Sequence, residues 1–484
     1  MKFLEIDKYH YVTAKDQGYL RELAKFVSKS EFLPKFHIYP KSGLMNDPNG
    51  LSYYNGAYHV FYQWFPFDAT HGMKHWGHMK SQDLLHWQDC GLALIPDQEY
   101  EKNGCYSGGA IEKDGLLYLF YTANYKTSAG KIPKQALAIM NQAGQIEKYA
   151  QNPILDGAPK GYSGELRDPF VFERDGAYYM LLGGSADETG TAKSFGQRGA
   201  LLLYQSSNLI DWAYKGEVEL PIETGYMLEC PSLIEVDGKE VLFLSPMGYQ
   251  PQKNRYQNRF ASIYLLGKLD VLNLRFDVEQ CDELDAGFDY YAPQAFYAKD
   301  NVPLSFAWFG CGEPLYESDK EKWKHGLTMP HELSLRSERL HRFPSKEILA
   351  AFSMLECNQK LVAPKMSFYH FSTEVSREQK NATIVFGNPG NTWQLDIDTE
   401  SGEVILDRSN LATPIDVEYG EDRRTILTAK TAIIQVDVFV DNSFIEIFLN
   451  QGEKVFSFRS FNLAKDHMIV SESVTNCKIG YYNR

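Results

Sequence analysis

The chain contains five copies of one short segment, and this repeat limits the possible folds more than any other feature. Four copies centre on the turns Asn55-Gly56, Asp114-Gly115, Asp175-Gly176 and Asp237-Gly238, and a weaker fifth centres on Asp300-Asn301. Successive turns are 59, 61, 62 and 63 residues apart. Each turn follows a short strand-like stretch and precedes an apolar or aromatic one. A period of about 60 residues suits a four-stranded antiparallel sheet with long loops, the blade of a β-propeller, so we predict five blades.

The rest of the chain divides around this repeat. We predict an N-terminal helical extension at 1–35, the propeller at 36–343, a linker helix at 344–359 and a β-sandwich at 360–484. In the extension, residues 12–31 carry Leu20, Leu23, Phe26 and Val27 at helical spacing. Beyond residue 360 many short runs alternate between apolar and polar residues, which is typical of a sandwich. The predicted fold class is therefore all-β, with one short N-terminal helix.

Composition excludes several classes of protein. The net charge is −14 and the Lys and Arg residues are scattered, which argues against nucleic acid or an anionic membrane as the main partner. The first residues carry charges where a signal peptide needs an apolar core, and no run approaches the roughly 20 apolar residues of a membrane span. The seven cysteines form no CxxC pair and are read as reduced thiols. These features favour the cytosol.

Three copies of the repeat carry an acid shortly before the turn. Asp47 and Glu229 lie nine residues before their turn glycines, and Asp168 lies eight before its own. Because equivalent positions of propeller blades converge on the central channel, we expect these carboxyl groups to meet there. Like charges in a partly dry pocket favour one proton donor beside an ionised partner, the pairing that cleaves glycosidic bonds. The apolar Met227-Leu228 before Glu229 suggests the donor, and Arg167 beside Asp168 suggests an acid that stays ionised.

Each of these motifs has an ordinary structural explanation when it stands alone. An Asp in Asn-Asp-Pro is usually a turn residue, and Arg-Asp-Pro is usually a loop ion pair. Their coincidence in the register of the repeat is what favours a functional site. His71, His75 and His78 have zinc-like spacing for a helix, but their stretch contains two glycines and belongs to the first blade. We predict neither a metal nor a cofactor.

Several segments in order resemble one known family. FHIYPKSGLMNDPNGL, FYQW, HGMKHWGH, YSGGA, LRDP, ECP, FDYYAPQ and LTMPHEL resemble those of glycoside hydrolase family 32, the group of invertases, sucrose-6-phosphate hydrolases and fructan hydrolases. The likeness covers about residues 36–343, with weaker support in the tail. It implies a propeller joined to a sandwich and a retaining mechanism with Asp47 as nucleophile, Asp168 as transition-state stabiliser and Glu229 as acid/base. Retention predicts carboxyl groups of Asp47 and Glu229 roughly 5–5.5 Å apart.

The resemblance also implies which residues surround the fructosyl unit. They are Asn46, Gln63, Trp76, Tyr106, Ser107, Arg167, Tyr291 and Trp308. The sequence departs from the family pattern at Met45, at Glu165-Leu166 and at His331. These positions are expected to lie near the catalytic set and not in it, so they leave the chemistry unchanged and the preference for the leaving group open.

The leading functional hypothesis is a cytosolic β-fructofuranosidase that acts on sucrose 6-phosphate. Sucrose and short fructo-oligosaccharides are alternative substrates, a fructosyltransferase would use the same residues, and a catalytically silent sugar-binding propeller is the alternative from another class. A phosphate needs cationic donors, for which Lys74, His75, Lys324 and His325 are candidates. The sandwich strands could support a homodimer, although nothing in the sequence requires one.

Overall fold

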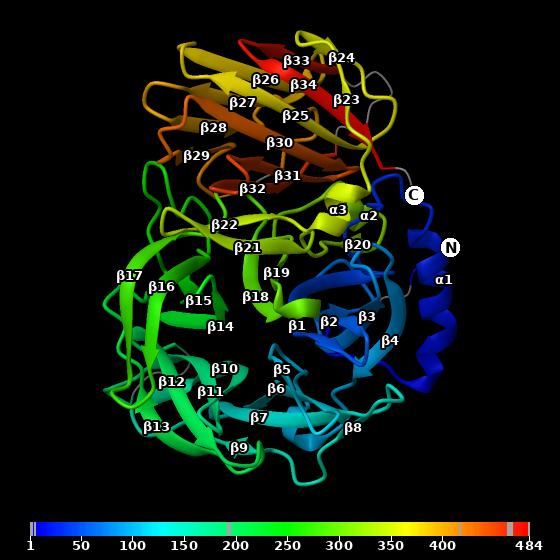
Figure 1. The fold of residues 1–484 in the computed structure, drawn as a ribbon. Coiled ribbons are helices and arrows are strands. Elements are labelled where there is room, and N and C mark those ends of the chain that lie inside the picture. The colour runs from blue at the N-terminus through cyan, green and yellow to red at the C-terminus, as the bar shows by residue number, and fades with distance from the viewer. Residues whose placement is uncertain (1–2, 4–5, 191–194, 416–417, 462–467, 483–484) are drawn as a thin grey trace.

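The computed structural model describes residue 3 and residues 6–190, 195–415, 418–461 and 468–482. Figure 1 shows a ring of five sheets, coloured blue to yellow-green, beside a stack of two sheets coloured mostly yellow to red. The ring is a five-bladed β-propeller and the stack is a β-sandwich. This confirms the predicted fold class.

The blades follow one another along the chain. Blade 1 contains β1 (Gly43–Tyr54), β2 (Ala57–Phe65), β3 (His75–Ser81) and β4 (Gln88–Leu94). Blade 2 contains β5 (Ala110–Lys113), β6 (Leu116–Thr127), β7 (Gly130–Met140), β8 (Ile146–Lys148) and, paired with β7, β9 (Leu155–Asp156). Blade 3 contains β10 (Tyr162–Arg174), β11 (Ala177–Ala186), β12 (Arg198–Ser206) and β13 (Ala213–Glu217). Blade 4 contains β14 (Met227–Val236), β15 (Lys239–Met247), β16 (Ile263–Asp270) and β17 (Arg275–Glu283).

Blade 5 closes the ring against blade 1. It contains β18 (Tyr291–Tyr297), β19 (Pro303–Trp308), β21 (His331–Arg336) and β22 (Arg339–Pro344). Between β19 and β21 the chain leaves this sheet, and β20 (Trp323–Lys324) pairs in parallel with the start of β1. A segment that belongs to the last blade in sequence therefore extends the sheet of the first.

The repeated turns explain why the blades share one sequence pattern. In blades 1 to 4 both turn residues have positive φ, for example 48° at Asn55 and 76° at Gly56. This is the conformation of a two-residue hairpin turn, for which Asn-Gly and Asp-Gly are strongly preferred. In blade 5 the turn lies in a 3₁₀ segment, η3 (Lys299–Asn301), with φ of 61° at Asp300 and 57° at Asn301. The weaker fifth copy thus reflects a different local turn.

The sandwich consists of two six-stranded sheets. One has the order β23 (Leu355–Glu356), β34 (Thr475–Tyr481), β25 (Phe368–Ser376), β30 (Ile433–Asp441), β31 (Phe444–Leu449) and β32 (Lys454–Arg459). The other has the order β24 (Leu361–Val362), β33 (Met468–Glu472), β26 (Asn381–Asn388), β27 (Asn391–Asp398), β28 (Glu403–Asp407) and β29 (Asp422–Ile426). Alternate residues of β27, namely Trp393, Leu395 and Ile397, are buried in the core between the sheets, as period-two patterning requires.

The helices are shorter than the sequence predicts. In the N-terminal extension, η1 (Ala14–Asp16) precedes α1 (Gln17–Val27), and Leu20, Leu23 and Val27 are its buried residues. Two further short elements are η2 (Glu99–Glu101) and α2 (Glu317–Lys320). The helix predicted over 344–359 is wrong beyond α3 (Lys346–Ala350), because the chain then turns and β23 adds an edge strand to the sandwich.

A cluster of buried charged residues joins the propeller to the sandwich. Asp441, at the end of β30, accepts hydrogen bonds from the backbone N–H groups of Phe36 (2.8 Å) and His37 (2.9 Å) and from His37 Nδ1 (2.8 Å). Glu446, in β31, accepts from His37 Nε2 (2.9 Å) and His331 Nε2 (2.7 Å). Arg342 donates to His331 Nδ1 at 3.0 Å. We call His37, His331, Arg342, Asp441 and Glu446 the interface cluster.

His331 therefore lies in the interface cluster and not beside the catalytic set where the sequence analysis expected it. Burial would lower the pKa of His37, but hydrogen bonds from its ring to the two carboxylates raise it. The pKa of Glu446 is lowered, because the two histidines outweigh the effect of burial. The cluster is consequently an ion-paired junction that fixes one domain against the other.

Candidate active site

The three repeat carboxylates line one cavity of about 600 Å³. Asp47 comes from β1, Asp168 from β10 and Glu229 from β14. Of the eight residues that the sequence analysis placed around the sugar, six line the same cavity: Asn46, Gln63, Tyr106, Arg167, Tyr291 and Trp308. The symmetry of the repeat therefore brings together residues that lie far apart in the sequence. We call this space the carboxylate cavity.

Irregularities in the innermost strands direct these side chains into the cavity. The pairing register shifts between Arg167 and Phe170 in β10, and between Glu229 and Ser232 in β14. At these bulges Asp168 has a φ of 63° and Cys230 a φ of 50°. A bulge inserts an extra residue and turns the strand locally, which commonly re-aims side chains at functional sites.

The bulges also explain why Asp168 is one residue out of register. Arg167, Glu229 and Tyr291 follow one another at intervals of 62 residues, so they occupy equivalent positions, and Arg167 and Tyr291 both donate to Glu229. The equivalent of Asp168 is Cys230, whose backbone N–H donates to Asp168 Oδ2 at 2.9 Å. Asp168 therefore reaches the cavity from the next position along its strand.

Asp47 is held by neutral donors. Ser107 Oγ donates to its Oδ2 at 2.5 Å, Gln63 Nε2 donates to the same oxygen at 3.2 Å, and Asn46 Nδ2 donates to Oδ1 at 3.2 Å. Burial and the charge of Glu229 raise the pKa of Asp47, and the hydrogen bonds from Ser107 and Asn46 oppose that rise. These hydrogen bonds orient the Asp47 carboxyl group, but its ionisation in this buried position remains unfavourable.

Asp168 is a second acid whose ionisation is disfavoured. It is 4% exposed, and burial together with the charge of Glu229 raises its pKa to about 7. Its own backbone N–H donates to Thr122 Oγ1 at 2.9 Å, which fixes the strand at this point. Because the charges of Glu229 and Asp47 act on Asp168, these acids titrate as a coupled group and not independently.

Glu229 lies against a cation and a hydroxyl group. Arg167 donates through Nε to Glu229 Oε1 at 2.8 Å and through its Nη2 at 2.7 Å, while the Tyr291 hydroxyl donates to Oε2 at 2.5 Å. The apolar surroundings inferred from Met227 and Leu228 are wrong, because both side chains are buried in the core and away from the cavity. Arg167 likewise pairs with Glu229 rather than with its sequence neighbour Asp168.

Glu165 forms a second ion pair with Arg167. It also accepts from Lys131 Nζ at 2.5 Å, and its side chain is only 6% exposed. Burial tends to lower the pKa of Arg167, but the charges of Glu229 and Glu165 raise it. Glu165, one of the departures from the family pattern, thus lies on the cavity wall and holds two of its cations.

Two predicted pocket residues lie behind the cavity instead of lining it. Trp76 is fully buried, and its indole Nε1 donates to the backbone oxygen of Tyr106 at 3.0 Å. Ser107 is 1% exposed and acts through its hydrogen bonds to Asp47 and Gln63. Both residues support groups that line the cavity.

The structure separates the histidines and most of the predicted phosphate ligands. His71 lines the cavity, whereas His78 pairs with His59 at 2.9 Å and His75 is fully buried, where its Nε2 accepts from Val12 N–H at 3.0 Å. The described residues contain no group of His, Cys, Asp or Glu arranged to hold a metal ion.

Lys74 alone of the four proposed phosphate ligands lines the cavity. It is buried, and its Nζ contacts Asn46 Oδ1 at 2.7 Å and His71 Nδ1 at 3.0 Å. Lys324 donates to Pro314 O and Asp319, and His325 is fully buried beneath Trp308. These two residues therefore belong to the fold around β20 and not to a phosphate site.

Other residues of the cavity wall escaped the sequence analysis. They are Lys8, Tyr9, Lys126, Lys131, Phe195, Arg259 and Phe260, among others. Most lie in loops or in the N-terminal extension, outside the innermost strands. Because the repeat pattern describes only the strands and turns that recur, it carries no signal for these positions.

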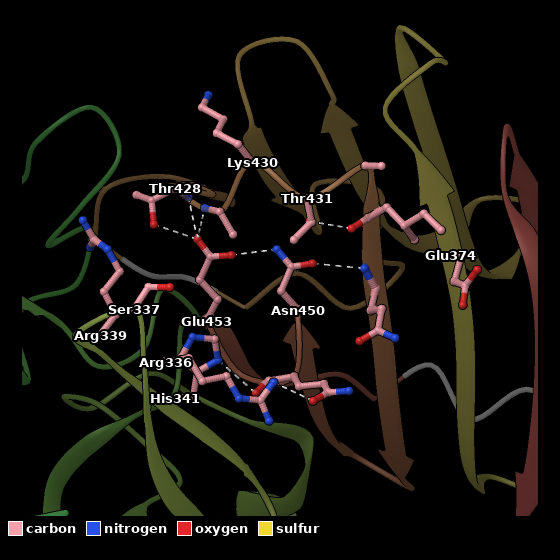
Figure 2. Close-up of a pocket in the computed structure, with 15 residues that line it drawn as sticks. Arg336, Ser337, Arg339, His341, Glu374, Thr428, Lys430, Thr431, Asn450 and Glu453 are labelled. Atoms are coloured by element: carbon pink, nitrogen blue, oxygen red, sulfur yellow. Dashed lines mark hydrogen bonds between the residues drawn. The ribbon is translucent and has the colours of Figure 1, made fainter. Parts of the chain in front are cut away.

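A second cavity, of about 810 Å³, lies between the β21–β22 hairpin and the sandwich (Figure 2). Its two acids are Glu374 in β25 and Glu453 in the turn before β32, and Figure 2 shows them apart from one another. Glu453 accepts hydrogen bonds from Thr428, Ala429 and Asn450. This carboxylate stabilises a loop, so the carboxylate cavity is the candidate active site.

No helix among the described residues is long and apolar enough to span a membrane. All seven cysteines are free thiols.

Comparison with known proteins identifies relatives along the whole chain. The family profile described as Glycosyl hydrolases family 32 N-terminal domain matches residues 37–344, and that described as Glycosyl hydrolases family 32 C terminal matches residues 345–479. The sucrose-6-phosphate hydrolase of Staphylococcus xylosus is 32% identical over 462 residues, covering 92% of this chain and 90% of that protein. The solved structure of sucrose-6-phosphate hydrolase from Lactobacillus gasseri is 31% identical with a TM-score of 0.91, covering 98% of each chain.

A second solved structure comes from an animal. A mutant of the GH32 beta-fructofuranosidase of Bombyx mori in complex with sucrose is 29% identical with a TM-score of 0.81, covering 96% of this chain and 98% of that chain.

Proposed function

The chain belongs to glycoside hydrolase family 32, and from this we propose that it is a retaining β-fructofuranosidase that hydrolyses sucrose 6-phosphate or sucrose. The observation that carries the proposal is the meeting of Asp47, Asp168 and Glu229 in one cavity. The names of the relatives, which include sucrose-6-phosphate hydrolases and a structure holding sucrose, support this substrate class.

In the proposed mechanism, Asp47 attacks the anomeric carbon of the fructosyl unit and forms a covalent intermediate. Glu229 protonates the leaving oxygen and then removes a proton from the water that releases fructose. The hydrogen bonds from Ser107 and Gln63 orient the Asp47 carboxylate for attack. Roughly 5–5.5 Å between the carboxyl groups of Asp47 and Glu229 remains the prediction for retention.

Asp168 is proposed to hold hydroxyl groups of the fructosyl ring. Among the described residues, its carboxyl group accepts hydrogen bonds from Cys230 alone, at 2.9 Å from N–H and 3.5 Å from Sγ. Sugar hydroxyls would supply further donors to this buried group, whose ionisation burial and the charge of Glu229 disfavour. Their contribution would grow as positive charge develops on the sugar ring in the transition state.

The proposal extends to where the protein works and how it assembles. Free thiols support a reducing compartment, and we place the protein in the cytosol. A homodimer through the sandwich strands stays a prediction, which the molar mass in solution will test.

Initial-rate kinetics with sucrose, sucrose 6-phosphate and kestose test the proposal, together with NMR of the first fructose anomer released. We expect hydrolysis with retention, and a loss of several orders of magnitude in kcat for Asp47→Asn. Asp114→Asn is the matched control, because it removes the same charge from an exposed turn with a φ of 52° that Asn also adopts. An active Asp47→Asn protein would overturn the assigned nucleophile, and the release of an inverted anomer would overturn retention.

A further inference from the structure

The N-terminal extension forms part of the wall of the carboxylate cavity. The family match begins at residue 37, yet Lys8 and Tyr9 line the cavity beside residues of the propeller. Both side chains are exposed, and Tyr9 retains 60% of its accessible surface. The extension thus contributes two side chains to the cavity that lie outside the residues matched by the family profile.

Specific contacts fix the segment in this position. Met73 N–H donates to Lys8 O at 2.6 Å, and Val12 N–H donates to His75 Nε2 at 3.0 Å. A Cβ atom at Gly72 would lie 2.8 Å from Lys8 O, so the loop before β3 is shaped to receive this backbone. Val12 and Leu20 pack in one apolar cluster with Phe65, Phe67 and Met73. The position of Lys8 is thus set by contacts with blade 1.

The Lys and Arg side chains of the cavity differ in whether they already form ion pairs or hydrogen bonds. Lys74 contacts Asn46 and His71, Lys131 pairs with Glu165, and Arg167 pairs with both Glu165 and Glu229. Within the described residues, Lys8 and Lys126 have no ion-pair partner. Lys126 lies at the end of β6, where its backbone N–H donates to Asn103 Oδ1 at 2.7 Å. Two exposed ammonium groups from separate segments therefore border one cavity on a protein whose net charge is −14.

We propose that Lys8 and Lys126, with Tyr9 between the cavity and solvent, form a leaving-group subsite for the phosphate monoester of a hexose. The inference rests on the proposed function and deepens it, because it makes the phosphorylated disaccharide the preferred substrate. In sucrose 6-phosphate the phosphate is on the glucosyl unit, which departs as glucose 6-phosphate. A phosphate dianion accepts charge-assisted hydrogen bonds from lysines, and the exposed ring of Tyr9 offers a flat face to the glucosyl ring.

The subsite would give the N-terminal extension a role in specificity. His75, which the sequence analysis considered as a phosphate ligand, acts indirectly by anchoring the segment that carries Lys8. The acids that share the outer wall, Glu165 and Glu313, do not cancel both lysines, because Glu165 is occupied by Lys131 and Arg167.

The test is the ratio of kcat/KM for sucrose 6-phosphate to that for sucrose, measured for Lys8→Met, Lys126→Met and the double variant. One charge-assisted hydrogen bond corresponds to a fall in this ratio of about tenfold, with a larger fall in the double variant. Lys215→Met is the matched control, because it removes the same charge from exposed β13 outside the cavity. A ratio that stays at the wild-type value in the double variant, or a wild type that does not prefer the phosphate ester, overturns the inference.

A binding measurement separates this inference from the proposed function. Calorimetric titration of the wild type with glucose 6-phosphate, glucose and inorganic phosphate requires no catalysis. We expect glucose 6-phosphate to bind more tightly than either of the others, and the double variant to lose that advantage. Failure of the wild type to hydrolyse any β-fructoside would refute the proposed function, whereas equal binding of the three probes would refute the subsite alone.

Discussion

The carboxylate cavity and the interface cluster both bury several charged side chains, but they supply them with partners in different ways. In the interface cluster, Asp441 and Glu446 accept from two histidines and from backbone N–H groups. In the cavity, Arg167 is the partner of both Glu229 and Glu165, and Asp47 has only neutral donors. The interface cluster therefore holds two domains together, whereas the carboxylate cavity keeps negative charge that a bound substrate could stabilise.

The pKa values of the acids also differ between the two regions. In the interface, the pKa of Glu446 is lowered because the histidine partners outweigh burial. In the cavity, the pKa values of Asp47 and Asp168 are raised because burial and the charge of Glu229 outweigh the donors. Buried charge alone therefore does not identify a reactive site. Carboxyl groups whose pKa is raised in spite of their hydrogen-bond donors, in a cavity that a ligand can enter, are the more informative property.

Glu229→Gln should produce the largest effect, and it tests whether a charge in the carboxylate cavity serves activity and not stability. If Glu229 is the acid/base that we propose, its removal should lower kcat/KM for a β-fructoside by about 10³-fold or more, because protonation of the leaving oxygen is lost. The free energy of unfolding should change by less than about 1 kcal/mol, since Arg167 keeps its pair with Glu165. Steady-state kinetics and urea unfolding measure the two quantities.

The control for this variant is Glu235→Gln, an exposed position on the same strand β14. It should leave both quantities at the wild-type level. A Glu229→Gln protein that is mainly destabilised would place Glu229 with the structural charges and remove the distinction between the two regions.

Glu446→Gln should produce the opposite result. His37 and His331 donate to different oxygens of Glu446, and the variant replaces one of these oxygens by an NH2 group, which is a donor. One buried donor therefore loses its acceptor, and the free energy of unfolding should fall by about 3 kcal/mol. Activity per folded molecule should be retained, because Glu446 does not line the cavity. Urea unfolding followed by tryptophan fluorescence measures the loss, with exposed Glu378→Gln as the control. Unchanged stability would show that the cluster does not hold the domains together.

The sequence predicted the first of these regions far better than the second. Asp47, Asp168 and Glu229 recur eight or nine residues before turns that favour Asn-Gly or Asp-Gly, so propeller symmetry alone was enough to bring them together. The interface cluster comes from three segments with no common period. Nothing near His331 in sequence indicates that its partner is Glu446, 115 residues away.

Within the cavity, the limits of sequence reasoning are equally specific. The repeat could not show that Asp168 faces the cavity from a bulge, because a bulge changes which neighbouring side chain points inward. For the same reason Arg167 pairs with Glu229 and not with Asp168. Lys8 and Tyr9 lie outside the repeat altogether, so only the docking of the N-terminal extension reveals them.

Asp168→Asn tests the raised pKa of a cavity acid through the pH dependence of stability. The ordinary pKa of this group is 3.8 and the folded value is about 7, so between these pH values the folded protein keeps a proton that the unfolded chain releases. Stability from this group is therefore full below about pH 4 and is lost as pH rises through 7. The variant should lack that loss and exceed the wild type at pH 8 by about 1–2 kcal/mol, although it loses activity.

Urea unfolding of the wild type and of Asp168→Asn from pH 4 to 8 gives the difference directly. The curves should lie close together near pH 4, separate progressively between about pH 4 and 7, and keep a constant difference above pH 7. Parallel curves would mean that Asp168 ionises as an ordinary exposed acid, contrary to its burial beside Glu229.

Lys74→Met should produce the smallest effect and tests how the cavity keeps Asp47 ionised. Lys74 Nζ lies 2.7 Å from Asn46 Oδ1, and the neighbouring charges of Asp47 and Glu313 attract its positive charge, although burial lowers its pKa to about 7. Removing this cation should raise the pKa of Asp47 and move the acid limb of the kcat/KM profile upward by about one pH unit. Lys80→Met, outside the cavity, is the control. A shifted KM with an unmoved acid limb would assign Lys74 to substrate binding, because a charge that does not act on the nucleophile cannot alter its ionisation.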